Sequence, residues 1–195
     1  MSSKNIGSAD IKTQSVDIPG ADGQLDLTEY FGEIKYKNRQ IKFNFSIIGK
    51  DNESLEKYSK IRNLLHGQKM QIRLSNDANC YYIGRISVGA WENKKRVATI
   101  AIDCDCEPYK YKINKTIVTE VINGTKIVPL LNSRKTVIPY ITVDKSAIIT
   151  FNNIDYELDA GTYQVDDIIL CEGPHLLKIT GNNVTCKIEY QEGDL

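Results

Sequence analysis

The sequence has 195 residues, of which 41% are apolar and 26% charged, as in a globular protein of one large or two small domains. Its 25 basic and 25 acidic residues cancel, and this balance argues against a general nucleic-acid binder. The sequence contains no long apolar run, so we expect no membrane span. It also lacks the apolar core of a secretory signal, so we expect the protein to be made in a cytoplasm.

One stretch, residues 17–45, organises the first half of the chain. It begins with a turn-rich loop at 18–23. Pro19 fixes its own φ there, and Gly20 and Gly23 can adopt positive φ. The composition predicts a rigid loop that presents backbone and an acidic side chain to a partner.

A strand is predicted after this loop. Apolar and polar side chains alternate from Gln40 to Ile47, which is typical of a half-buried strand in an antiparallel sheet. Upstream, residues 1–10 are polar and expected to be loose, and 11–17 is a candidate first strand. The stretch 35–42 is locally basic but lacks a dense set of aromatic residues. This composition favours a solvated or partner-facing strand over a nucleic-acid groove. Its basic residues are Lys35, Lys37, Arg39 and Lys42.

One helix and three further strands are expected in the first half. The helix is predicted at 53–66, and strands at 70–74 and 81–88 read as a hairpin. A strand at 97–106 follows and is expected to stop at Pro108. The predicted apolar stripe of the helix comprises Leu55, Tyr58, Ile61, Leu64 and Leu65.

From residue 113 the pattern changes to short strands joined by turns. Three hairpins are predicted, with turns at Asn123-Gly124, Asn152-Asn153 and 181–183. Several short strands without a helix are typical of a β-sandwich. We therefore predict two domains, 1–112 and 113–195.

The cysteines and histidines do not predict a catalytic or metal site. Cys104 and Cys106 share a face of their strand and would be either half of a metal site or two buried apolar residues. A zinc site needs about four ligands and no second Cys/His pair is visible, which favours the apolar interpretation. His66 and His175 have no nucleophile or carboxylate in a recognisable pattern. We expect no enzymatic activity, cofactor or metal.

Three acidic residues, Asp103, Asp105 and Glu107, are expected on one face of a strand. They would bind a cation, meet a basic surface of a partner, or form a solvated face. Their spacing does not match a calcium-binding loop, so the solvated face is favoured.

Five segments of the first half, in this order and spacing, resemble the signature of phage distal tail proteins, the Dit family. These segments are Val16–Thr28, Tyr36–Phe43, Leu65–Gln68, Tyr81–Arg85 and Cys106–Tyr111. The second half resembles the smaller galectin-like sandwich of that family only in size, position and strand texture.

This resemblance implies a mainly β fold: an N-terminal β-barrel-like sheet with one α-helix and a β-hairpin, then a small C-terminal β-sandwich. It implies a structural baseplate component at the virion tail tip of a phage, prophage or tail-like particle. Six copies would form a ring that joins the tail-tube protein to the tail-associated hub protein. DNA would pass through the lumen without specific nucleic-acid binding.

We expect the subunit or tube interface at the loop 18–23 and the strand 35–45. The candidate residues are Ile18, Pro19, Gly20, Asp22, Gly23, Lys37 and Arg39. The alternative function is a carbohydrate-binding or adhesin module acting through the C-terminal sandwich. It would require an exposed aromatic platform, whereas the tyrosines of that region are scattered and also fit core or rim positions: Tyr140, Tyr156, Tyr163 and Tyr190.

Overall fold

The computed structural model describes residues 2–30, 32–48, 51–94 and 97–195. The described chain is mainly β, with a curled sheet and one helix, as the sequence predicts. It packs into two compact units, Met1–Arg73 with Tyr82–Pro108, and Leu74–Tyr81 with Tyr109–Leu195. The division at residue 112 stays a prediction. No helix in the described part of the chain has the length and apolarity needed to cross a membrane.

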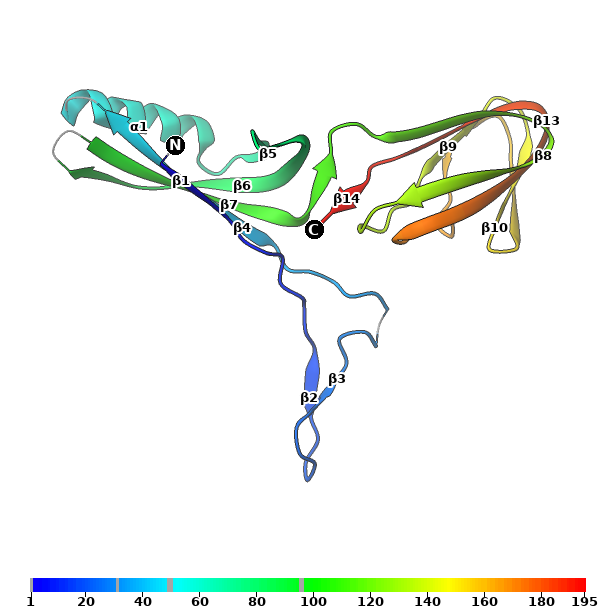
Figure 1. Ribbon diagram of the computed structural model, residues 1–195, viewed down its shortest axis with the longest axis horizontal. Helices are drawn as coiled ribbons and strands as arrows, with labels where there is room; N and C mark the ends of the chain where they lie inside the picture. Colours follow the sequence, from blue (N-terminus) through cyan, green and yellow to red (C-terminus); the bar gives the residue numbers. More distant parts are fainter. Residues whose placement is uncertain (1, 31, 49–50, 95–96) are drawn as a thin grey trace. The chain divides into compact units, whose positions relative to one another are not determined.

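The first unit is built on a sheet with strand order β1-β4-β7-β6-β5 (Figure 1). Alternation puts one face of β4 and β7 inward, so Ile41 and Phe43 are buried together with Ile100 and Cys104. The predicted strand from Gln40 is thereby confirmed. The strands are β1 Ser3–Ile6, β4 Arg39–Ile48, β5 Lys69–Leu74, β6 Asp77–Lys94 and β7 Val97–Lys112.

Two strand predictions in this unit were wrong. Ser3–Ile6 is not loose, because all four residues pair antiparallel with β4, from Asn44 to Ile41. Pro108 does not stop β7, which continues to Lys112. The register of β4 on β7 ends at Cys106 and that of β14 (Gly193–Asp194) begins at Lys110. Pro108 therefore lies opposite neither β4 nor β14, so its missing N–H removes no ladder bond along that edge of β7.

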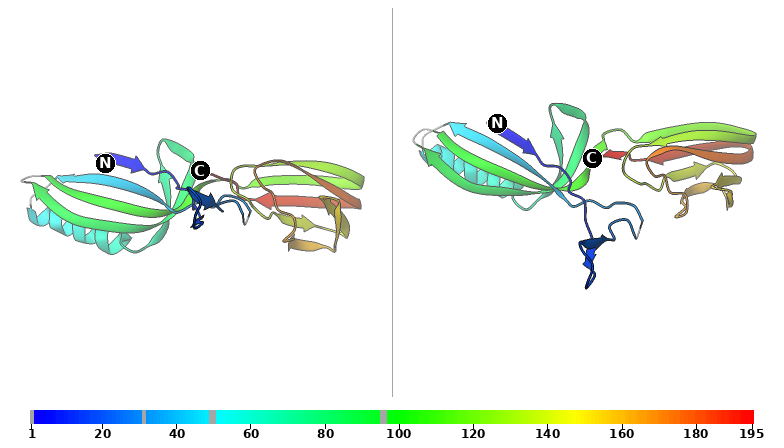
Figure 2. Two further views of the ribbon diagram at one scale, coloured as in Figure 1. Left: turned by 90° about the horizontal axis from the view of Figure 1, so that it is seen from below. Right: turned by 60° about the horizontal axis from the view of Figure 1, so that its bottom comes forward.

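Helix α1, Asp51–Leu65, lies along one face of this sheet (Figure 2). Its inward face comprises the buried Ser54 and three half-buried members of the predicted stripe, Tyr58, Ile61 and Leu65. The Tyr58 hydroxyl donates to the carbonyl of Gly89 at 3.1 Å. The predicted stripe was too wide, since Leu55 and Leu64 are exposed. These leucines are nine residues apart, about two and a half helical turns, and cannot share one face.

The second unit has two β layers that share their two longest strands, β8 (Thr116–Asn132) and β13 (Gly173–Tyr190). The first half of β13 pairs with β10, and its second half pairs with β9. We call the side with β10 the first layer and the side with β9 the second layer. The remaining strands are β9 Tyr140–Val143, β10 Ala147–Phe151, β11 Ile154–Leu158 and β12 Gly161–Gln164.

The core of this unit lies between the two layers. It includes Val128, Leu177 and Ile149 from the first layer, and Ile141 and Ile188 from the second. All five are almost completely buried. A β-strand that passes from one layer to the other needs a sharp bend between its halves.

Two predicted turns supply that bend and are not hairpins. Asn123-Gly124 of β8 lies opposite Gly181-Asn182 of β13, and the register shifts between Asn182 and Val184. Gly124 and Asn183 have positive φ, as turn residues would, but here they form a bulged bend inside two continuous paired strands. The hairpin at Asn152-Asn153 is confirmed between β10 and β11.

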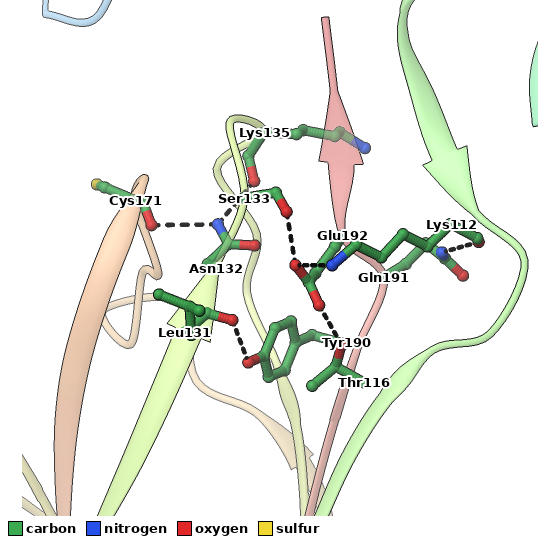
Figure 3. Close-up of polar contacts among 10 residues, drawn as sticks. All are labelled: Lys112, Thr116, Leu131, Asn132, Ser133, Lys135, Cys171, Tyr190, Gln191 and Glu192. Carbon is green, nitrogen blue, oxygen red and sulfur yellow. Dashed lines mark hydrogen bonds and ion pairs between the residues drawn. The ribbon is translucent and has the colours of Figure 1, made fainter. Parts of the chain in front are cut away.

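A polar network fixes the C-terminal segment of the second unit (Figure 3). The buried carboxylate of Glu192 accepts hydrogen bonds from Lys112 Nζ at 2.6 Å, from Ser133 Oγ at 2.6 Å and from the Thr116 hydroxyl. The Asn132 side-chain amide donates to the carbonyl oxygens of Lys135 and Leu170, both at 2.8 Å. This network holds the chain end against the start of β8 and the loop after it.

Candidate assembly surface

The arm, which we define as residues 10–30 and 32–37, inserts between β1 and β4 and carries a separate two-stranded sheet. That sheet pairs β2 (Ser15–Asp17) with β3 (Gln24–Asp26). Backbone hydrogen bonds close the stem, from Lys12 N to Lys35 O at 2.8 Å and from Lys37 N to Asp10 O at 2.7 Å. The arm is therefore a continuous ribbon whose tip is the predicted loop 18–23.

Side-chain hydrogen bonds make this hairpin a defined shape. Gln24 bridges the two strands, accepting from Ser15 Oγ and donating to Asp17 Oδ1, both at 2.9 Å. Asp26 accepts the N–H of Thr28 at 2.8 Å, and hydrogen bonds from Thr28 lower the pKa of this carboxyl. Gly20 and Gly23 have positive φ, as the loop composition predicted.

Apolar side chains on the arm are exposed. Val16 and Leu25 lie directly opposite each other on β2 and β3, and each is nearly half exposed. Ile18 at the tip and Ile11 in the stem are exposed to a similar extent. An isolated two-stranded hairpin is marginally stable in water. Exposed apolar residues on such an element favour a partner that covers them.

Charge is unevenly distributed along the arm. Between Ser15 and Asp26 every charged residue is a carboxylate, whereas the stem also carries lysines. The three carboxylates of the tip region are Asp17, Asp22 and Asp26, and the three lysines of the stem are Lys12, Lys35 and Lys37. The stem also carries three carboxylates, Asp10, Glu29 and Glu33, which balance its lysines. The tip would therefore repel a second tip and would be attracted only to the lysines of a stem.

A hollow of about 290 Å³ lies at the base of this hairpin. Ile11 and Ile34 form its apolar part, and Thr13, Asp26 and Glu29 its polar part. It is large enough to receive an aliphatic side chain.

The structure separates the predicted interface residues into two groups. Arg39 is buried, with its guanidinium 5.4 Å from the ring centroid of Tyr82. It occupies the inward phase of β4, two residues before Ile41, so its charge was a poor guide to its position. Its role in an interface stays a prediction, and substituting it would disturb the core. The exposed members are Ile18, Pro19, Gly20, Asp22, Gly23 and Lys37.

Sequence reasoning overlooked Ile11, Val16 and Leu25, which extend the exposed apolar surface of the arm. The signal was available in part. Two short strand-like stretches on either side of the turn residues 18–23 indicate a hairpin, and a two-stranded hairpin by itself has little core in which to bury apolar side chains.

The other sequence candidates have structural roles. Cys104 and Cys106 are buried, and burial raises the pKa of these thiols to about 11 and about 12. Within the described residues, no group of His, Cys, Asp and Glu is arranged to hold a metal. His66 Nδ1 accepts the N–H of Val88 at 3.0 Å, and His175 Nε2 lies 2.9 Å from the carbonyl oxygen of Cys171.

Two of the three acidic residues on β7, Asp105 and Glu107, contact polar side chains of other segments. Asp105 accepts from Asn38 Nδ2 at 3.2 Å and from Gln40 Nε2 at 3.0 Å. Glu107 pairs with Lys69 at 2.8 Å. These contacts fit the solvated, hydrogen-bonded face that the spacing favoured.

Comparison with known proteins identifies the fold. No protein-family model and no curated protein matches the sequence. Among solved structures, the Dit protein (gp 19.1) of phage SPP1 superposes with a TM-score of 0.64 at 15% sequence identity. The match covers 96% of this chain and 91% of the SPP1 protein. The chain therefore has a Dit-like fold.

Proposed function

We propose that this protein is a structural component of a phage tail tip. In this role, identical copies form a hexameric ring that joins the tail tube to the hub protein, at the tip of a virion or tail-like particle. The SPP1 protein is described as a paradigm of the hub adsorption apparatus in phages that infect Gram-positive bacteria, and the likeness spans nearly the whole chain. The resemblance of five sequence segments to distal tail proteins supports the same role.

The observation that carries self-assembly is the exposed apolar arm. Four aliphatic side chains, Ile11, Val16, Ile18 and Leu25, are each 42–48% exposed on an element with little core of its own. Burying the exposed half of one such side chain contributes about 1 kcal/mol, so the four together contribute several kcal/mol per contact. A second copy of the chain is the partner that a virion supplies in fixed stoichiometry.

Charge disfavours a tip-to-tip contact in this proposal. Acidic tips repel each other, so a two-fold contact between tips is disfavoured. A tip that meets the lysine-bearing stem of the next copy makes a heterologous contact, and such contacts close into rings when the rotation allows. Ile18 would contact Ile11 and Ile34 in the hollow of the next copy. The tip carboxylates would then lie toward the stem lysines and away from Asp26 and Glu29, which also line the hollow.

The two predicted domains would then have different tasks. The N-terminal domain, 1–112, would form the ring through its arm and contact the tube and the hub. The C-terminal sandwich, 113–195, would lie outside that contact.

The test is molar mass by light scattering over a concentration series, with negative-stain imaging of the same fractions. We expect rings of six times the 22.0 kDa of one chain. Ile18→Asp adds a carboxylate to the acidic tip and should yield folded monomers. Ile154→Asp changes an exposed aliphatic residue in the sandwich and serves as the matched control, which should still form rings.

Two results would contradict the proposal. One is a single mass of 22.0 kDa for the wild type at every concentration. The other is normal rings from Ile18→Asp, which would separate ring formation from the arm. Circular dichroism of each variant checks that the fold is intact.

A further inference from the structure

A hollow of about 380 Å³ lies in the second unit, and no residue of the arm lines it. This volume falls in the range of small-molecule sites. Its polar lining comes from four separate segments, contributed by Lys115, Lys135, Tyr140, Gln164 and Glu189. We call it the Tyr140 hollow.

Strand register brings its central residues into one row. Tyr140 of β9 lies directly opposite Gln164 of β12 on one side and Glu189 of β13 on the other. Directly opposed residues have Cβ atoms about 5 Å apart and point to the same face. The row therefore places an aromatic ring between an amide and a carboxylate on the outer face of the second layer.

Tyr140 differs from the other three tyrosines of residues 113–195. It is 48% exposed, whereas Tyr190 is 3% exposed and donates its hydroxyl to the carbonyl of Leu131 at 2.7 Å. Tyr156 and Tyr163 are half-buried and pack against the core. Tyr190 also lines the hollow but is almost completely buried, so Tyr140 is the exposed tyrosine of its lining.

Two lysines hold the carboxylate of the row in place. Glu189 accepts from Lys115 Nζ at 2.5 Å and from Lys187 Nζ at 2.8 Å. Hydrogen bonds from Lys115 and then Lys187 lower the pKa of Glu189 to about 2. The group is an oriented acceptor at neutral pH, with ammonium donors beside it that retain further N–H groups.

The wall beside the row is anchored. The backbones of Val137 and Leu170 exchange two hydrogen bonds, at 3.0 and 2.9 Å. Gln164 Nε2 donates to the carbonyl of Ile138 at 3.2 Å. Lys135, in the loop drawn in Figure 3, places its Nζ 4.7 Å from the ring centroid of Tyr111. A hollow with anchored walls requires little ordering of the protein when a ligand binds.

We propose that the Tyr140 hollow binds a saccharide. A pyranose has an apolar C–H face that packs on an aromatic ring and hydroxyl groups that each donate and accept. An aromatic ring flanked by a fixed carboxylate, an amide and ammonium groups supplies both kinds of contact in one row. A free anion fits less well, because Glu189 lies between the two lysines that would attract it. The site lies in the sandwich and does not depend on ring formation through the arm.

Saturation-transfer NMR on the full chain tests this site. The probes are the methyl glycosides of glucose, galactose and N-acetylglucosamine, with inorganic phosphate titrated separately by chemical-shift change. We expect transfer to at least one glycoside, strongest on the protons of one ring face. Tyr140→Ala should weaken the affinity for that glycoside about tenfold, and Gln164→Ala should weaken it less.

Tyr30→Ala, which removes an exposed tyrosine from the arm, is the matched control and should leave the affinity unchanged. The proposal is refuted by the absence of transfer to all three glycosides, or by equal affinity in Tyr140→Ala and the wild type. Binding of phosphate alone would also refute it, since it would identify an anion site. Tyr140 and Gln164 are exposed, so their truncation should leave the fold intact. Circular dichroism of each variant against the wild type checks this before binding is measured.

Discussion

Replacing Glu192 with alanine should destabilise the second unit strongly for a single polar substitution. Its side chain is 6% exposed and accepts hydrogen bonds from Lys112, Ser133 and Thr116. A hydrogen bond to a charged group contributes about 1.5–3 kcal/mol, and leaving a buried donor without an acceptor costs about 1–3 kcal/mol. The Lys112 side chain is 42% exposed and can turn to water, which reduces the loss. We expect a net loss of about 2–4 kcal/mol.

Two further substitutions resolve the sources of this loss. Glu192→Gln keeps an oxygen acceptor for the hydroxyl groups but removes the charge, and should cost about half as much as alanine. Glu172→Ala is the matched control. Glu172 pairs with Arg134 on the surface and is 56% exposed, so its loss should cost less than about 1 kcal/mol.

The assay must report the second unit alone. Trp91 belongs to the first unit, so tryptophan fluorescence would not follow the relevant transition. Hydrogen–deuterium exchange of the segment 184–194 along a urea series reads the unfolding free energy where the network lies. For a domain of about 100 residues, 1 kcal/mol corresponds to about 4–8 °C in Tm. A loss for Glu192→Ala no larger than that for Glu172→Ala would refute the reasoning.

The pH dependence of this loss has a definite sign. Burial raises the pKa of Glu192, but the hydrogen bonds from Lys112, Ser133 and Thr116 outweigh it and leave the pKa below its ordinary 4.5. The native state therefore binds fewer protons than the unfolded state in acid. The stabilisation is complete above pH 4.5 and is lost as the pH falls through the folded-state pKa. The difference between wild type and Glu192→Ala should shrink accordingly.

Three further predictions concern a tightly packed glycine, three buried thiols and the charge of the tip. In Gly84→Ala the new Cβ would lie 2.5 Å from Cys106 Sγ and 3.0 Å from a backbone oxygen, so the first unit should lose about 1–3 kcal/mol, as measured by the Trp91 transition. Cys104, Cys106 and Cys186, whose pKa values burial raises to about 11, 12 and 11, should resist iodoacetamide at pH 8 until urea unfolds the chain; rapid native labelling would contradict this. Asp22→Lys should weaken self-association at low salt and lose its effect at high salt, as measured by light scattering; a salt-independent effect would argue against charge pairing at the tip.

Much of the sheet could be predicted because strand alternation is local. The alternation from Gln40 to Ile47 identified the inward residues Ile41 and Phe43 without knowledge of any partner strand. The same holds for the hairpin at Asn152-Asn153, where both residues have positive φ and the turn closes strands adjacent in sequence. In these elements the deciding interactions lie within a few residues.

The candidate sites were only partly accessible to the same reasoning. The loop 18–23 was identified from its turn residues, but the exposure of the apolar residues on either side of it, Val16 and Leu25, was not. Arg39 was placed on the surface by its charge, whereas its strand phase puts it beside Tyr82 in the core. The Tyr140 hollow joins residues at 115, 140, 164 and 189, and only the pairing of β9 with β12 and β13 brings them together.

By itself the sequence determined the phase of the strand from Gln40, the helix in the first half, the acidic tip and the residues able to adopt positive φ. It did not determine whether Asn123-Gly124 and Gly181-Asn182 would end strands or bend them, because a hairpin turn and a bulge need the same backbone freedom. The long pairing of β8 with β13 decided that question. Two continuous strands that bend together bury both halves in one core, whereas two separate hairpins would leave unpaired edges. Tertiary pairing thus converted two local turn signals into the corner of the sandwich.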